Sequence, residues 1–189
     1  MTNAQVMDGS ALAEKIRAEV AAGAAELDRA PGLAAVLVGE DPASQVYVAA
    51  KGRAAEEAGF VSESLRLPAD ATEGAVLEAV AGLNGRDDID GILVQLPLPD
   101  QVDVERVVAA VDPDKDADGF HPVNIGRLAR GLPAPVSCTP AGVMRLLDEE
   151  HRQASPSPED LKLELSINEL SMQIVQAALD RLLELYNDD

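Results

Sequence analysis

The sequence predicts an α/β protein: a three-layer domain with a largely parallel sheet flanked by helices, followed by a C-terminal strand-helix appendage. Short segments predicted as strands, at 33–38, 61–67 and 91–95, alternate with longer segments whose apolar residues recur every three or four positions. Gly and Pro separate the two kinds of segment. Strands that alternate with helices of ten or more residues imply crossover connections and a largely parallel sheet.

The first helix is predicted over residues 10–27, which are rich in alanine, with Asp8 or Ser10 placed to cap its start. Residues 33–38 then form a continuous apolar run that follows a Pro-Gly breaker. This pattern is typical of a strand that is buried on both faces of a parallel sheet. Residues 39–44 turn into the next helix.

The middle of the chain repeats this order. We expect a helix from that turn to about Gly59, a strand at 61–67, a helix at 72–83 and a strand at 91–95. In such sheets ligands gather outside the carboxyl ends of the strands, and the last of these strands ends at Gln95.

Proline residues divide the rest of the predicted domain. Residues 96–99 leave the sheet as a stiff loop because their two prolines cannot donate backbone hydrogen bonds. A helix is predicted at 102–111, and an irregular segment at 133–140. A last helix is predicted at 141–149, with Thr139-Pro140 as its cap and first position.

The sequence after this helix changes in character. Residues 1–149 are predicted to form one domain, and residues 150–160 a Pro/Ser-rich exposed linker. Residues 161–189 combine a strand-like alternation with a helix that opens on a capping box. The apolar stripe of this tail helix needs a cover, so we expect it to mediate packing, a homodimer or contact with a partner chain.

Composition limits the classes of function. The formal net charge of −19 argues against nucleic acid and anionic membranes as partners. The single cysteine, Cys138, forms no intramolecular disulfide and is expected to be a small buried hydrophobic residue. Without a signal peptide or an apolar run long enough to span a membrane, the expected location is the cytoplasm.

Three short stretches carry most of the chemistry: residues 44–51 (SQVYVAAK), 95–99 (QLPLP) and 116–122 (DADGFHP). In the first stretch, helical spacing places Ser44, Tyr47 and Lys51 side by side on one face. A hydroxyl, an aromatic ring and an amine would then share one wall of a cleft.

These stretches resemble the bifunctional methylenetetrahydrofolate dehydrogenase/methenyltetrahydrofolate cyclohydrolase family, from about Val6 to about Glu149. The resemblance implies a tetrahydrofolate derivative as the small-molecule partner and substrate. In the family an NADP-binding Rossmann domain follows at this point. Here we find no Gly-x-Gly-x-x-Gly or Walker-type loop, so we expect this chain to bind no cofactor and to lack dehydrogenase activity on its own.

The resemblance also implies roles for individual residues. Lys51 matches the acid/base group of the cyclohydrolase step, in which water attacks the methenyl carbon. Gln95 matches the glutamine that supports it, Tyr47 matches a ring that packs on the folate, and Asp118 matches the acceptor of hydrogen bonds from the pterin. The catalytic candidates are therefore Lys51, Gln95 and Tyr47, and the substrate-binding candidates are Tyr47, Gln95, Asp118, Leu96 and Pro97.

Each of these residues also has a plainer interpretation. A lysine on a helix face is most often a solvated charge, and an amide at a strand end often satisfies loop backbone. Ser44 is expected to cap its helix, and His121 to be structural. The Asp-rich run at 112–119 fits no calcium loop, and two histidines far apart make no metal set.

Two functions remain open from the sequence. The chain is either an enzyme limited to hydrolysis of 5,10-methenyltetrahydrofolate to 10-formyltetrahydrofolate, or a non-catalytic folate-binding or interaction module. Turnover separates the two, because only the first requires Lys51 to move a proton.

Overall fold

The structure, a computed structural model, describes residues 7–153. The chain divides into two compact units. The first is Ala13–Ser137, and the described residues of the second are 7–12 and a helix, α6 (Cys138–Gln153). The predicted tail at 161–189 and most of the predicted linker at 150–160 lie outside the described residues, and the predicted domain boundaries stay predictions.

A three-stranded parallel sheet forms the centre of the larger unit. Its order is β2 (Val61–Leu67), β1 (Gly32–Val38) and β3 (Gly91–Val94), with β1 in the middle. Both neighbours run parallel to β1, and Val36 is aligned with Leu65 on one side and with Val94 on the other. The predicted strands are confirmed. A fully apolar segment such as β1 is stable only where both of its faces are covered.

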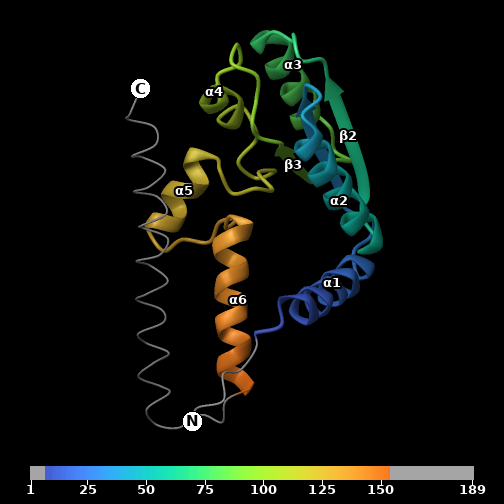
Figure 1. Cartoon of the computed structure of the whole chain (residues 1–189), viewed down its shortest axis with the longest axis vertical. Coiled ribbons are helices and arrows are strands. Elements are labelled where there is room, and N and C mark those ends of the chain that lie inside the picture. Colours follow the sequence, from blue (N-terminus) through green and yellow to red (C-terminus); the bar gives the residue numbers. More distant parts are fainter. Residues whose placement is uncertain (1–6, 154–189) are drawn as a thin grey trace. The chain divides into compact units, whose positions relative to one another are not determined.

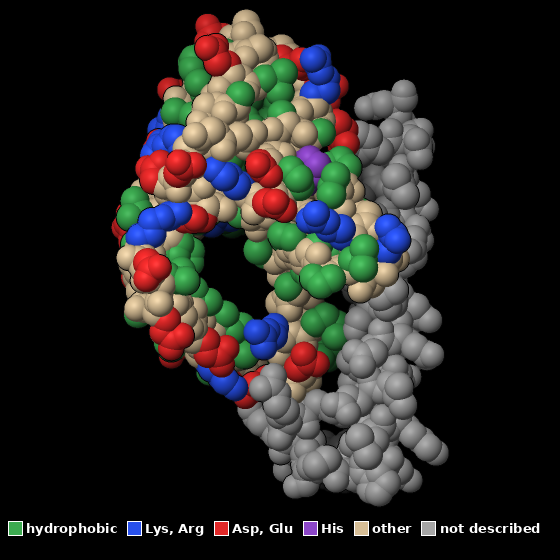
Figure 2. All heavy atoms as spheres, turned by 180° about the vertical axis from the view of Figure 1, so that it is seen from behind, with side chains coloured by type: hydrophobic (Ala, Val, Ile, Leu, Met, Phe, Trp, Pro, Cys, Tyr) green, Lys and Arg blue, Asp and Glu red, His purple; other side chains and the backbone are tan. Residues whose placement is uncertain are grey.

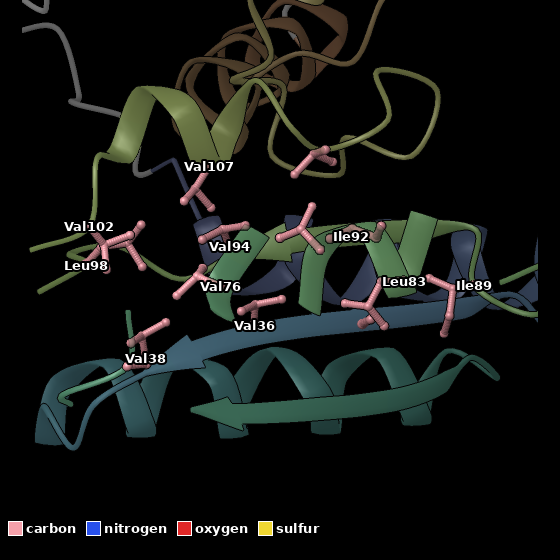
Figure 3. Packing of buried hydrophobic residues seen from close by; sticks show 14 residues of the cluster. Val36, Val38, Val76, Leu83, Ile89, Ile92, Val94, Leu98, Val102 and Val107 are labelled. Atoms are coloured by element: carbon pink, nitrogen blue, oxygen red, sulfur yellow. The ribbon is translucent and has the colours of Figure 1, made fainter. Parts of the chain in front are cut away.

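Successive residues of β1 face opposite sides of the sheet, and different helices cover the two sides. Ala34, Val36 and Val38 join a cluster with side chains of α3 (Glu73–Asn84) and α4 (Val104–Val108). Figure 3 shows Val76, Leu83 and Val107 of these helices pointing toward the strands. Ala35 and Leu37 face the other way and pack with Val48 of α2 (Pro42–Glu57). Figure 1 shows α2 and α3 alongside the sheet, so the predicted three-layer α/β fold is confirmed.

Side-chain caps set the starts of several helices. α1 (Gly9–Ala25) begins after Asp8, whose carboxylate accepts from the N–H groups of Ser10 and Ala11. α3 begins after Thr72, whose hydroxyl accepts from the Ala75 N–H. The prediction that Ser44 caps α2 is wrong. Asp41 is the cap and accepts from the Ser44 N–H, while Ser44 itself is buried toward the sheet.

The segment after β3 differs most from the sequence prediction. The helix predicted at 102–111 is only five residues long, because Asp103 caps it and the residues before it form a turn. A helix that we did not predict, α5 (Pro122–Ala129), follows. α6 begins at Cys138 and ends at Gln153, so it includes Thr139-Pro140 and the first residues of the predicted linker.

The described residues include no helix that is both long and apolar enough to cross a membrane. On the face shown in Figure 2, acidic and basic side chains lie interspersed over the described residues. A surface of this kind offers no large basic patch to nucleic acid on that face.

Candidate functional site

Two of the predicted stretches begin at carboxyl ends of the sheet. β1 ends at Val38 and leads through a turn into α2, which carries Tyr47 and Lys51. β3 ends at Val94, and Gln95 follows it directly, with its N–H donating to the Val36 carbonyl oxygen at 2.9 Å. The predicted place of the site at this edge of the sheet therefore agrees with the topology.

Lys51 and Asp118 meet across this edge. The distance from Lys51 Nζ to Asp118 Oδ1 is 3.8 Å, and the side chains are 42% and 17% exposed, respectively. Burial raises the pKa of Asp118, the positive charge of Lys51 opposes that rise, and the nearby carboxylate of Asp116 adds to it. The site thus pairs an accessible amine with a carboxyl group that is costly to ionise.

Asp118 is held by a loop built around the neighbouring residue Asp116. The carboxylate of Asp116 accepts from three backbone N–H groups, those of Gly119 at 3.0 Å, Phe120 at 3.3 Å and His121 at 2.9 Å. It also accepts from Asn124 Nδ2 at 2.9 Å. We did not predict a role for Asp116 from the sequence. The pattern that could have indicated one is an aspartate followed within five residues by a glycine and a helix start.

Gln95 does not pair with Lys51 in the way the resemblance implies. Its Nε2 donates to the Leu96 carbonyl oxygen at 2.7 Å, while its Oε1 is buried and has no hydrogen-bond partner among the described residues. The peptide bond between Leu96 and Pro97 is cis. Leu96 packs against the main apolar cluster, and Pro97 is exposed.

The predicted shared face of Ser44, Tyr47 and Lys51 is only partly correct. Helical spacing does place Tyr47 and Lys51 on one exposed side of α2, and Tyr47 is 62% exposed. Ser44 instead lies on the buried side with Val48. The spacing fixes which residues are neighbours but not which side the sheet covers.

His121 is structural. Its Nδ1 accepts from the Val123 N–H at 3.1 Å, so the ring proton resides on Nε2, which lies 3.2 Å from the Ala109 carbonyl oxygen. In this way the imidazole caps α5 and ties it to the end of α4. Cys138 is exposed, so the prediction of a buried position is wrong. This residue begins α6 instead of lying in an irregular segment.

No group of three or more His, Cys, Asp or Glu side chains within residues 7–153 is arranged to hold a metal ion. The described residues also do not fit a nucleotide diphosphate in the turn after β1. A diphosphate needs a helix N-terminus with free N–H groups, but the Asp41 carboxylate already accepts the Ser44 N–H there. A second negative group at this helix start would be repelled by the Asp41 carboxylate.

Comparison with known proteins places this geometry in context. Residues 7–118 match the model of the tetrahydrofolate dehydrogenase/cyclohydrolase catalytic domain. The chain is 60% identical over 144 residues to the bifunctional protein FolD of Acidiphilium cryptum, which covers 76% of this chain and 52% of that relative. It is 58% identical over 156 residues to the bifunctional protein FolD of Nitratidesulfovibrio vulgaris, which covers 80% of this chain and 54% of that relative.

Solved structures give the same result. The bifunctional FolD methylenetetrahydrofolate dehydrogenase/cyclohydrolase of Campylobacter jejuni superposes with a TM-score of 0.75 at 41% identity, over 77% of this chain and 53% of that one. The Trypanosoma brucei enzyme, solved with NADP cofactor and an inhibitor, superposes with a TM-score of 0.75 at 38% identity, over 79% of this chain and 53% of that one. The chain spans about half the length of the curated relatives it matches.

Proposed function

The chain belongs to the tetrahydrofolate dehydrogenase/cyclohydrolase family, and from this premise we propose that the residues around Lys51 form the folate side of a one-carbon active site. The proposed reaction is hydrolysis of 5,10-methenyltetrahydrofolate to 10-formyltetrahydrofolate. The observation that carries the proposal is the approach of Lys51 Nζ to Asp118 Oδ1, 3.8 Å apart, at the carboxyl edge of the sheet. An amine and a carboxyl group from distant parts of the chain meet where such sheets bind their ligands.

Each residue has a role that suits its position. The accessible amine of Lys51 is the proposed acid and base, because a general base must reach the proton that it moves. Asp118 accepts from the N–H edge of the pterin, a charge-assisted pairing. The exposed ring of Tyr47 offers the pterin a flat apolar face one helical turn from Lys51. The buried Oε1 of Gln95 offers an acceptor to a bound donor.

The proposed step consumes one water molecule and releases one proton. The oxygen of a water molecule bonds to the methenyl carbon, and the bond between that carbon and N5 breaks. Lys51 removes one proton from the water and delivers it to N5, and the second water proton leaves to solvent. The positive charge of the methenyl substrate is thereby replaced by one released proton, and neither an oxidant nor a reductant is required.

We propose no step through NADP for the described residues, because the start of α2, which follows β1, is already capped by the Asp41 carboxylate. Folate is the proposed small-molecule partner. The cytoplasmic location, and pairing through the tail at 161–189, stay predictions.

The test is hydrolysis of 5,10-methenyltetrahydrofolate by the purified full chain, followed by the loss of substrate absorbance. Lys51→Met retains the length of the side chain and removes the proton-carrying group, so we expect its rate to fall to the buffer background. Arg53→Met is the matched control on the same helix, since Arg53 is also exposed and also carries one positive charge. We expect Arg53→Met to retain the wild-type rate.

A second function is favoured by one observation, the exposure of Lys51 and Tyr47, because an open site excludes little water and positions a substrate weakly. This alternative is a folate-binding module without turnover. If the folded wild-type chain binds tetrahydrofolate in calorimetry but hydrolyses nothing, the binding function replaces the enzymatic one. If it does neither, both are wrong.

A further inference from the structure

We propose that Asp116 is a positioning residue of this site: its carboxylate shapes the 116–121 loop and thereby sets the distance between Asp118 and Lys51. The inference rests on the proposed function where it concerns catalysis. Its structural part, the placement of Asp118 by Asp116, is independent of which reaction the site performs.

The backbone is anchored on both sides of Asp118. On one side, a parallel bridge joins Asp116 to Ile92 of β3, with the Ile92 N–H donating to the Lys115 carbonyl oxygen at 2.7 Å. The Ala117 N–H donates in turn to the Ile92 carbonyl oxygen at 3.1 Å. The residue before Asp118 is therefore fixed to the sheet.

The residue after Asp118 is held by the side chain of Asp116. The Gly119 N–H donates to Asp116 Oδ1 at 3.0 Å, and Gly119 has φ +71°, a conformation that favours glycine. Asp118 thus lies between one residue held by β3 and another held by the Asp116 side chain. Its own carboxylate contacts Lys51, so the position of that contact is determined by its two neighbours.

The position of Asp116 requires a carboxylate. Four N–H donors converge on Asp116: three from the loop backbone and one from Asn124. An ionised carboxylate has two oxygens with about four acceptor sites, so it is matched to this set. An asparagine keeps one oxygen and turns an NH₂ group toward two of the donors. Asp116 is only 6% exposed, so water cannot readily replace the lost acceptor.

Asn124 links the loop to α5. Asn124 is fully buried, and its Nδ2 donates to the Pro113 carbonyl oxygen at 2.8 Å as well as to Asp116. The side chain therefore holds the carboxylate from the far side of the loop. Because Asn124 contributes only one of the four donors to Asp116, its removal is a milder perturbation of the same network.

The experiment compares four variants of the full chain: Asp116→Asn, Asn124→Ala, Asp118→Asn and the control Asp114→Asn. Asp114 lies in the same segment, but its side chain is 83% exposed, so it matches the charge change without the buried contacts. Two quantities are measured. One is kcat/KM for hydrolysis of 5,10-methenyltetrahydrofolate, and the other is the titration of the Asp118 side-chain carboxyl carbon by NMR, which requires no folate.

We expect Asp116→Asn to lower kcat/KM by about 10- to 100-fold, as displacement of a catalytic contact by about 1 Å does, with Asp114→Asn close to wild type. Loss of the Asp116 charge by itself lowers the titration midpoint of Asp118, so a fall in Asp116→Asn does not separate positioning from charge. Asn124→Ala changes no charge but removes one donor to the Asp116 carboxylate, so we expect the Asp118 midpoint to shift in this variant because Asp118 has moved. An unchanged Asp118 midpoint in Asn124→Ala would overturn the inference.

Two further outcomes are also decisive. If Asp116→Asn does not fold, Asn124→Ala decides by the same two measurements, and a wild-type titration and rate in that variant overturn the inference. If the wild-type chain shows no turnover, the proposed enzymatic function fails. The NMR titration then judges the placement of Asp118 alone, so the two failures are distinguished.

Discussion

Replacing Gln95 tests whether a residue of the proposed site lowers the stability of the fold. Its Oε1 is buried without a hydrogen-bond partner among the described residues, and its Nε2 donates to Leu96. A buried polar atom without a partner costs about 1–3 kcal/mol, and a neutral hydrogen bond contributes about 0.5–1.5 kcal/mol. Gln95→Met removes both terms in a side chain of similar length. The cost of the unpaired atom exceeds the contribution of the hydrogen bond, so this variant should be more stable than the wild type by about 1 kcal/mol.

The assay is urea unfolding of the full chain, followed by circular dichroism. With a urea dependence of about 1–3 kcal/mol per molar, the midpoint should rise by roughly 0.3–1 M. The hydrolysis rate of the same variant should fall, because the acceptor is lost. A midpoint that falls by more than about 0.5 M would refute the reasoning, since it would show that the Gln95 amide is a net stabilising group in the free protein.

Gln95→Glu serves as the matched comparison, because it preserves shape and adds a charge. At neutral pH a carboxylate here should destabilise the fold, since burial opposes ionisation. The same burial raises the pKa of the introduced carboxyl group in the folded state. The folded state then binds its proton more tightly than the unfolded state, so the stability of the variant should rise as pH falls through that raised value. Midpoints measured from pH 7 to pH 4 should converge on the wild-type curve.

Three further predictions concern the loop and the sheet edge. Burial raises the pKa of Asp118, so ionising this carboxyl group opposes folding. The Asp118→Asn variant should therefore be at least as stable as the wild type at pH 7. Melting temperatures should show this advantage shrinking as the pH falls toward 3.8. Gly119→Ala should lose about 1–3 kcal/mol in urea unfolding, because φ is +71° and a Cβ would lie 2.9 Å from the Pro135 carbonyl oxygen, whereas Gly126→Ala, with nothing within 4 Å, should not lose stability. Asp90→Ala should cost about 1–2 kcal/mol by the same assay, since this carboxylate binds an arginine and the first N–H of β1.

The sequence predicts the sheet well because its strands are determined by local composition. The run at 33–38 is apolar at every position and follows a glycine, and no helix face requires that pattern. The place of Gln95 follows from the same reasoning, because the residue after a buried parallel strand lies at the carboxyl edge. The approach of Lys51 to the 116–122 stretch was implied by the family resemblance and not by any local pattern.

The features that the sequence did not predict depend on tertiary contacts. α5 begins at a proline after a histidine cap, and histidine is a rare cap whose ring here also contacts α4. Ser44 and Asp41 are both common capping residues, and only the burial of Ser44 against the sheet decides between them. Asp116 looked like one acid in an acidic turn, because its role requires four donors that converge only in the folded loop.

The two aspartates of this loop, Asp116 and Asp118, differ in how far their hydrogen-bonding capacity is used within the protein. Asp116 is saturated by four donors inside the protein, so ligand binding has little to add to it. Asp118 is only partly buried, with 17% of its side chain exposed, and its ion pair with Lys51 spans 3.8 Å, long for a hydrogen bond. Two acceptors at this edge, Asp118 and the Oε1 of Gln95, therefore stand partly or wholly unsatisfied in the free protein. A ligand whose N–H donors reach Asp118 would gain more here than at a saturated group of the loop, which is the property a binding site requires.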